Sequence, residues 1–124
     1  MHKSAYKNKM NKLIPAAKAI SDENRARMLY LVIQRECCVC EVMDVLGISQ
    51  TRASRNLSIL HKVGFLQVRR QGLWVYYSMD KSKLSDYLLS LLKSVEQGLK
   101  QDKQAQADVR KLKNTNGEKL CCNK

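Results

Sequence analysis

Three of the five cysteines of this 124-residue chain lie within four positions, at Cys37, Cys38 and Cys40. The other two, Cys121 and Cys122, are also adjacent. Thiolates are soft ligands that select soft acceptors such as arsenite, antimonite, cadmium, lead or zinc. Cysteines also serve as small hydrophobic core residues, but three in four positions are hard to explain in that way. The odd number and the paired spacing predict metal or redox chemistry in a reducing compartment, not a disulfide framework.

The charge of the chain points to a polyanionic partner. There are 23 Lys and Arg against 11 Asp and Glu, so the formal net charge is +12. Nucleic acid is the first candidate for the partner, and solubility alone is the alternative explanation. Apolar residues make up 44% of the chain, in runs too short to span a membrane. We therefore expect a folded cytoplasmic protein with no membrane partner.

Two helical patterns separated by a glycine follow the first three cysteines. Val42, Met43 and Leu46 mark one face of a short helix, which Gly47 ends. Ser49 is a favourable N-cap for a second helix that extends to about residue 64. Such a pair of helices is typical of a helix-turn-helix, whose second helix can enter the major groove of DNA. An ordinary helical hairpin with a solvated face is the alternative.

The second helix has one apolar face and one basic face. Ala53, Leu57 and Leu60 recur at helical spacing and predict the inward face, whereas the opposite face is polar and carries no acid. Side chains near the start of this helix are able to reach base edges. The candidate DNA-contacting residues are Ser49, Gln50, Thr51, Arg52, Ser54, Arg55, Asn56 and Lys62.

The segment after this helix predicts a β-hairpin. FLQV and LWVYYSM are rich in β-forming residues, and Arg-Arg-Gln-Gly between them is typical of a turn. A two-stranded hairpin in this place is the wing of a winged helix. Arg69 and Arg70, at its predicted tip, suit contacts with phosphate or with the minor groove. The hairpin also has three aromatic residues that could stack on bases but that we expect to pack on the core: Trp74, Tyr76 and Tyr77.

Longer helical patterns flank this region. Apolar residues recur at helical spacing over 10–20, and we expect this helix to begin or kink near Pro15. Residues 21–24 are typical of a cap for the next helix. A last amphipathic helix over 84–99 has few partners left in the chain, which predicts a homodimer interface formed with the first helix. Folding of this helix back onto its own domain is the alternative.

These patterns predict a mostly α fold with a small β-hairpin wing, a homodimeric winged helix-turn-helix. Residues 1–99 would form the DNA-binding and dimerisation domain. Residues 100–124 are rich in Gln, Lys and Asn and have no aromatic residue. They would form a flexible or weakly helical basic tail that carries the Cys121–Cys122 pair.

Three segments carry a family resemblance: AISDENRARMLYLV, CVCEVMDVLGISQTRASRNLSIL and GLWVYYSM. In this order they resemble the arsenic-repressor (ArsR/SmtB-type) family of winged-helix metalloregulatory transcriptional repressors, over roughly half of the chain. The resemblance implies a homodimer that binds a pseudo-palindromic operator in double-stranded DNA. It also implies that a soft metal or metalloid releases the operator, and that arsenic-resistance genes are controlled.

The resemblance also implies which thiols bind the inducer. The Cys-Val-Cys element of the family aligns with Cys38-Val39-Cys40. Some members have a third cysteine where Met43 stands here, and many have His where Asn56 stands. The last predicted helix has no His, so the zinc site that some members place there is not expected.

The sequence does not decide which residue would supply the third sulfur ligand. Trivalent arsenic takes three sulfurs, whereas cadmium and zinc generally need four ligands. Cys37 would share a helical face with Cys40 and is the first candidate. Cys121 and Cys122 are alternatives, because twenty-odd flexible residues span about 25 Å. We expect As(III) or Sb(III) as inducer, with Cd(II), Pb(II), Zn(II) or oxidants as alternatives.

The spacing of Cys38 and Cys40 suggests how the inducer would act. Residues two apart project in nearly opposite directions from a helix. Both thiols could therefore hold one ion only if the start of the helix is not regular. Because this helix packs against the second helix, we expect a distortion here to move the DNA-reading face.

Other classes of protein have less support. A thiol oxidoreductase needs an activated thiolate, but the C-x-x-C spacing occurs only at Cys37 to Cys40, and His2 and His61 are distant in sequence. A structural zinc module that binds proteins would unfold when the metal is removed. We find no acid–base pair, phosphate-binding loop or nucleophile elbow, so the sequence predicts that the protein is not an enzyme.

Overall fold

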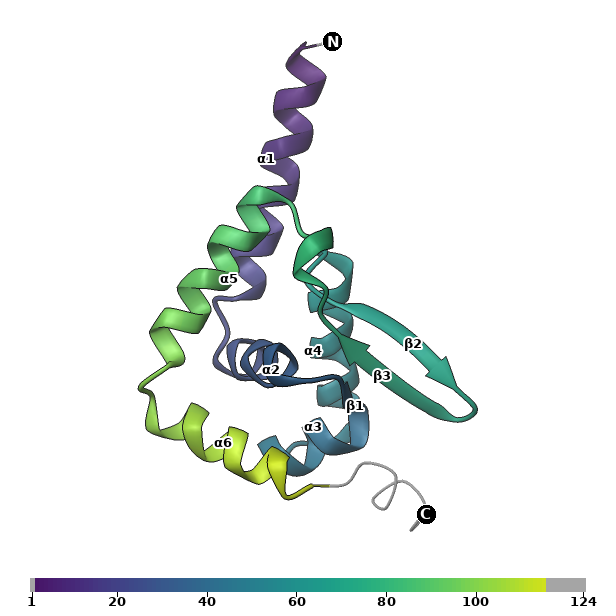
Figure 1. Ribbon diagram of the computed structural model, residues 1–124. Helices are drawn as coiled ribbons and strands as arrows, with labels where there is room; N and C mark the ends of the chain where they lie inside the picture. The colour runs from purple at the N-terminus through teal and green to yellow at the C-terminus, as the bar shows by residue number, and fades with distance from the viewer. Residues whose placement is uncertain (1, 116–124) are drawn as a thin grey trace.

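The computed structural model describes residues 2–115 and is mostly helical, with one small sheet (Figure 1). Among the described residues, none of the helices combines the length and the apolar character that a membrane span requires. The predicted fold class is confirmed, since a helix-turn-helix is followed by a hairpin. In chain order the elements are α1 (His2–Ala19), α2 (Glu23–Gln34), β1 (Cys37–Cys38), α3 (Val39–Leu46), α4 (Gln50–Lys62), β2 (Gln67–Gln71), β3 (Trp74–Ser78), the 3-10 helix η1 (Lys81–Lys83), α5 (Asp86–Leu99) and α6 (Lys103–Lys113).

The helix-turn-helix forms where its local signals predict it. Gly47 ends α3 in the left-handed conformation, with φ +67°, and its N–H donates to the Met43 carbonyl. The hydroxyl of Ser49 accepts the N–H of Arg52 at 3.2 Å and so caps α4. The predicted inward face of α4 is fully buried, and its members are Ala53, Leu57 and Leu60.

The sheet has one strand more than predicted. Its order is β1-β3-β2 with antiparallel pairing throughout, and β1 is the two-residue strand Cys37–Cys38. The predicted turn is wrong in position: Arg69 and Arg70 lie inside β2, opposite Tyr76 and Val75. Of the predicted turn residues, only Gly72 lies in the turn; it has φ +62°, a conformation that glycine adopts without strain.

The start of α2 was predicted correctly, whereas the start of α1 was not. α1 runs through Pro15, so of the two predicted alternatives, a start or a kink near Pro15, the start is wrong. The first part of α1 projects beyond the rest of the molecule, and its second part lies beside α5 (Figure 1). The predicted cap of α2 is confirmed, since the Asp22 carboxylate accepts the N–H of Arg25 at 3.0 Å.

Part of the segment predicted as a tail belongs to the packed domain. α6 lies against α2 and α3 (Figure 1) and buries Leu112. Its Asp108 carboxylate is buried and accepts two hydrogen bonds from the Arg27 guanidinium of α2, at 2.8 and 3.0 Å. The domain therefore extends past residue 99, because α6 offers an apolar stripe and a paired carboxylate that a composition count does not reveal. Cys121 and Cys122 lie outside the described residues.

We expect Leu112→Ala to lower the free energy of unfolding by about 2–5 kcal/mol, because it would leave a cavity between α6 and the core. Lys111→Ala, at an exposed neighbouring position, is the matched control and should change stability by less than about 0.5 kcal/mol. Urea denaturation followed by circular dichroism measures both. Equal effects of the two substitutions would contradict the packing of α6.

Candidate functional site

Cys37 is a core residue. It is fully buried in β1, where its backbone pairs with Tyr77, and its thiol donates to the Arg35 carbonyl at 3.3 Å. Burial, followed by the nearby Glu41 carboxylate, raises the pKa of the Cys37 thiol to about 12. The prediction that Cys37 shares a helical face with Cys40 is wrong, because Cys37 lies in a strand that ends before α3 begins.

Cys38 stands at the junction of β1 and α3. Its backbone is extended, with φ −86° and ψ 159°, and it is the N-cap residue of α3. Cys38 and Glu41 form a capping box in which the Cys38 N–H donates to Glu41 Oε1 at 2.9 Å. Cys40 lies in the first turn of α3 and is half-buried. The two thiols therefore do not both sit in regular helix, and the irregular start that we expected ligand binding to impose is already present.

Cys38 and Cys40 line one small pocket of about 100 Å³. Three elements meet there: α3, the first turns of α4, and the wing formed by β2 and β3. Cys37 does not line the pocket. The remaining lining residues are Val39 and Met43 of α3, Gln50 and Ser54 of α4, and Leu73, Trp74 and Val75 of the wing.

Within the described residues, no third Cys and no His, Asp or Glu joins the two thiols in the lining of this pocket. No group of three His, Cys, Asp or Glu side chains within the same residues could hold a metal ion. Two thiols and the Met43 thioether are thus the sulfur atoms that the described residues bring to the pocket. Thiols are soft ligands suited to thiophilic species, and the wing residues in the lining would add apolar contacts.

An ion-pair network fixes the start of α3, and the sequence alone did not point to it. The buried carboxylate of Glu41 accepts two hydrogen bonds from the Arg35 guanidinium, at 3.1 and 2.7 Å. Arg35 also donates to the Leu112 carbonyl of α6 at 3.1 Å. Hydrogen bonding to Glu41 is the main reason why the pKa of Arg35 is raised. The sequence feature that could have indicated this network is the position of Glu41, three residues after the N-cap residue Cys38, which is the spacing of a capping box.

The outward face of α4 carries most of the predicted DNA-contacting side chains. Asn56 differs: its amide oxygen accepts from Arg25 of α2 at 2.9 Å, and its amide nitrogen donates to the Arg52 carbonyl at 3.0 Å. Ser54 is half-buried and lines the thiol pocket. The predicted residues that are exposed on α4 and at its cap are Ser49, Gln50, Thr51, Arg52, Arg55 and Lys62.

The two predicted wing arginines have different surroundings. Arg69 donates to both carboxylate oxygens of Glu36, at 2.9 and 2.8 Å, and its guanidinium lies 4.3 Å above the Tyr76 ring. The hydrogen bonds from Arg69 hold the pKa of Glu36 below its usual value. Arg70 is exposed in the same strand. The wing is therefore tied through Arg69 to the residue that precedes β1.

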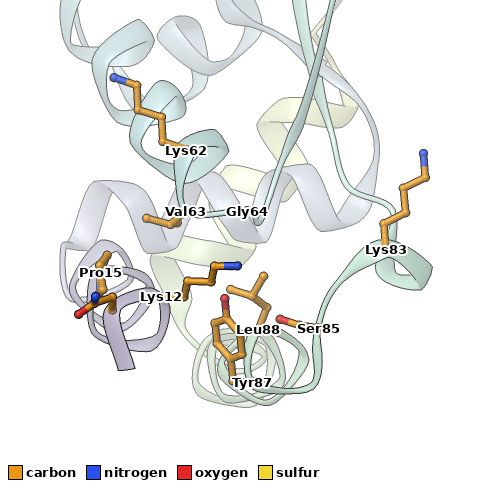
Figure 2. Close-up of a pocket in the computed structure, with 10 residues that line it drawn as sticks. Lys12, Pro15, Lys62, Val63, Gly64, Lys83, Ser85, Tyr87 and Leu88 are labelled. Atoms are coloured by element: carbon orange, nitrogen blue, oxygen red, sulfur yellow. The ribbon is translucent and has the colours of Figure 1, made fainter. Parts of the chain in front are cut away.

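A second pocket, of about 610 Å³, lies between α1, the end of α4 and the start of α5 (Figure 2). Its lining has no thiol but includes Lys12, Lys62 and Lys83. In Figure 2 the side chains of Lys62 and Lys83 extend away from the pocket. They add positive charge to the molecular surface at the end of α4.

Known proteins resemble this chain in sequence and in fold. The family model described as bacterial regulatory protein, arsR family, matches residues 22–68. The arsenic resistance transcriptional regulator ArsR2 of Pseudomonas putida is 39% identical over an alignment of 111 residues, which covers 85% of this chain and 93% of that protein. A cadmium resistance transcriptional regulatory protein CadC homolog of Staphylococcus aureus is 38% identical over 64 residues, 51% of this chain and 53% of that protein.

A solved structure agrees with the fold. It is the homodimeric winged helix-turn-helix DNA-binding domain Mb0332 of Mycobacterium bovis, with a TM-score of 0.60 and 24% identity. The alignment covers 76% of this chain and 83% of that one. At this identity the likeness concerns the fold.

We expect iodoacetamide at pH 8 to alkylate Cys40 and to spare Cys37 in the folded, reduced protein. The thiolate is the nucleophile, and a pKa of about 12 keeps the buried Cys37 thiol protonated at that pH. Fragment mass spectra of the peptide that contains both cysteines measure the two rates, and the same reaction in urea should modify both. Equal rates in the folded protein would contradict the burial of Cys37.

Proposed function

The chain belongs to the arsR family of bacterial regulatory proteins, and from this premise we propose that it is a metalloid-responsive transcriptional repressor. It binds operator DNA as a homodimer in the cytoplasm and leaves the DNA when As(III) or Sb(III) binds Cys38 and Cys40. Members of the family are DNA-binding transcriptional regulators and not enzymes. The observation that carries the proposal is the pocket in which two thiols meet α4 and the wing.

The position of this pocket supports a direct effect on DNA binding. Gln50 and Ser54 of α4 line it together with the thiols, so a bound ligand would contact the helix that reads DNA. Trp74 of the wing also lines it. A ligand held there would change the angle between α4 and the wing. A coupling free energy of about 1–3 kcal/mol, or roughly 5–150-fold in affinity, is typical of such linkage.

The proposed DNA contact uses the basic face of α4. Thr51, Arg52 and Arg55 are exposed there, and the helix carries no acid. Its first turns would contact base edges in the major groove. Lys62 and the wing residue Arg70, both exposed, would contact phosphates.

Exposed apolar residues on α1 support the homodimer. Met10, Leu13 and Ile14 are 66%, 39% and 47% exposed, and α1 lies beside α5 (Figure 1). Large apolar side chains gathered on one exposed surface mark interaction sites. The structural relative from M. bovis is described as homodimeric, and a two-fold dimer would match a pseudo-palindromic operator.

The third sulfur of an arsenite complex would come from outside the described pocket. Cys121 or Cys122, of the same or of the partner subunit, are the proposed donors. Cys37 is disfavoured, because it does not line the pocket and burial raises the pKa of its thiol to about 12.

A second candidate is a sensor of Cd(II), Pb(II) or Zn(II) on the same fold, and the CadC-type relative favours it. Such ions generally need four ligands, so this function requires still more donors from elsewhere than arsenite does. Oxidation of the thiols is the remaining alternative. Release of DNA caused by oxidation would be reversed by a reductant alone, without a chelator.

We expect micromolar arsenite to release the reduced protein from its own promoter DNA, and Cys38→Ser to abolish the release, because one of the two thiols is lost. Fluorescence anisotropy of labelled DNA measures this, and its saturation point should give two chains per duplex. Cadmium is titrated separately. Cys37→Ala, which removes a core thiol, is the matched control and should still respond. If arsenite leaves the anisotropy of the wild-type complex unchanged, the proposal is wrong.

We expect Arg55→Ala to weaken operator binding by about 1–3 kcal/mol, because Arg55 lies on the reading face. Arg110→Ala, an exposed position of α6, removes the same charge and should have a much smaller effect. Anisotropy titrations at one salt concentration compare the two. Equal losses would show that net charge alone accounts for binding.

A further inference from the structure

Asn56 of α4 was predicted to contact DNA, but its side chain joins α4 to the rest of the molecule. Arg25 of α2 holds the Asn56 amide and also the end of α1. We propose that Arg25 and Asn56 are positioning residues: their hydrogen bond fixes α4 relative to α1 and so makes the repressor select the spacing of the two operator half-sites. This inference rests on the proposed function and names a specificity determinant of the same DNA interface.

Arg25 connects three helices. Its backbone N–H donates to the Asp22 carboxylate, which caps α2. Its guanidinium donates to the carbonyls of Ala19, at 2.6 Å, and Lys18, at 3.5 Å. These carbonyls belong to the last turn of α1, where the helix dipole favours a cation. The remaining bond, from Nη1 to Asn56 Oδ1 at 2.9 Å, reaches α4.

The amide group of Asn56 is occupied at both of its polar atoms. Oδ1 accepts from Arg25, and Nδ2 donates to the Arg52 carbonyl of the preceding turn at 3.0 Å. A guanidinium only donates and a carbonyl only accepts, so this orientation of the amide satisfies both bonds and the reverse orientation satisfies neither. The side chain is half-buried. Asn56 therefore holds α4 in place, because bidentate reading of an adenine would need the same two atoms.

The hydrogen bond adds direction to the apolar contacts of α4. Ala53, Leu57 and Leu60 hold α4 on the core through burial, and the hydrophobic effect is non-directional. A hydrogen bond, in contrast, weakens steeply when its angle is bent. The bond from Arg25 to Asn56 thus resists rotation of α4 about its own axis and tilting of α4 away from the end of α1.

In a two-fold dimer, the link from α1 to α4 determines how the two reading helices lie relative to each other. α1 carries the exposed apolar residues of the proposed dimer surface and contacts both α4 and α5. Half-sites one helical turn apart are separated by about 34–36 Å. One inserted base pair moves them by about 3.4 Å and rotates them by about 35°. A dimer with both α4 helices fixed must deform such DNA to bind it, which lowers affinity.

The experiment compares operator duplexes that differ only in the spacing of their half-sites. Footprinting on the promoter first locates the operator, and duplexes are then made with one base pair inserted or removed between the half-sites. Anisotropy titrations with the full-length reduced protein give a dissociation constant for each duplex. The measured quantity is the ratio of the constant for altered spacing to that for natural spacing, which is unaffected by a uniform loss of affinity.

The variants separate positioning from stability. Asn56→Ala removes the acceptor for Arg25 but leaves the bonds from Arg25 to α1 in place. Asn56→Asp retains an acceptor oxygen for Arg25. Arg27→Met is the matched control, because Arg27 is also a hydrogen-bonded arginine of α2 but pairs with Asp108 of α6.

We expect the wild-type chain to lose about tenfold in affinity for one inserted base pair, because the DNA must be twisted to fit. Asn56→Ala should lower this ratio to less than about threefold, since α4 can then turn with the half-site and less deformation is needed. Asn56→Asp should keep the wild-type ratio even though its charge weakens binding to every duplex. Arg27→Met should lower the melting temperature and leave the ratio unchanged.

Two results would overturn the inference and leave the proposed function intact. One is a wild-type chain that binds every spacing equally well, and the other is an Asn56→Ala chain that keeps the wild-type ratio. In the second case, a loss of preference at a single base pair would show that Asn56 reads DNA directly. If the wild-type chain does not bind the promoter at all, the proposed function fails and the inference fails with it.

Discussion

The carboxylate of Glu41 is the group on which the arrangement of this molecule depends most. It is buried, and a buried charge is tolerated only when it is paired and hydrogen-bonded. Glu41 satisfies this requirement with the Arg35 guanidinium and the N–H of Cys38. Loss of one partner of a fully buried pair costs about 3–5 kcal/mol, and the cost here is smaller because the Arg35 side chain is 40% exposed. The pair joins the end of α2, the junction of β1 and α3, and the end of α6.

This junction explains why two cysteines so close in sequence line one pocket. Cys38 is the last residue of β1 and the cap of α3, so its backbone is extended while Cys40 is already helical. The spacing alone suggests that the two side chains project in opposite directions from a regular helix. That rule does not apply here, because Cys38 lies outside the helix. The pairing of β1 with β3 brings the wing to the same place, and α4 closes the pocket with Gln50 and Ser54. A ligand bound by the thiols, as we propose, would contact both α4 and the wing.

The features that the sequence predicted correctly are those set by interactions between near neighbours. The Asp22 and Ser49 caps, the left-handed Gly47 and the buried stripe of α4 each depend on residues within about two helical turns. The wing was predicted as a hairpin but with its turn too early, because arginines are common in turns and strands alike. The flanking β-formers did not show that the strand continues to Gln71.

Contacts between distant segments decided the rest. β1 exists because Cys37 and Cys38 pair with Tyr77 and Tyr76, about forty residues away, and no local signal in two residues predicts such a strand. That pairing places Cys37 in the core and Cys38 at the pocket. The residue type is the same at both positions, so it could not predict that their surroundings differ. Likewise α6 belongs to the domain because Asp108 meets Arg27. The sequence by itself determined the helices, their caps, the charge and the presence of thiols, because these are local or compositional properties. Only the tertiary structure decided which thiols line one pocket and which side chains surround them, because burial and strand pairing depend on the whole chain.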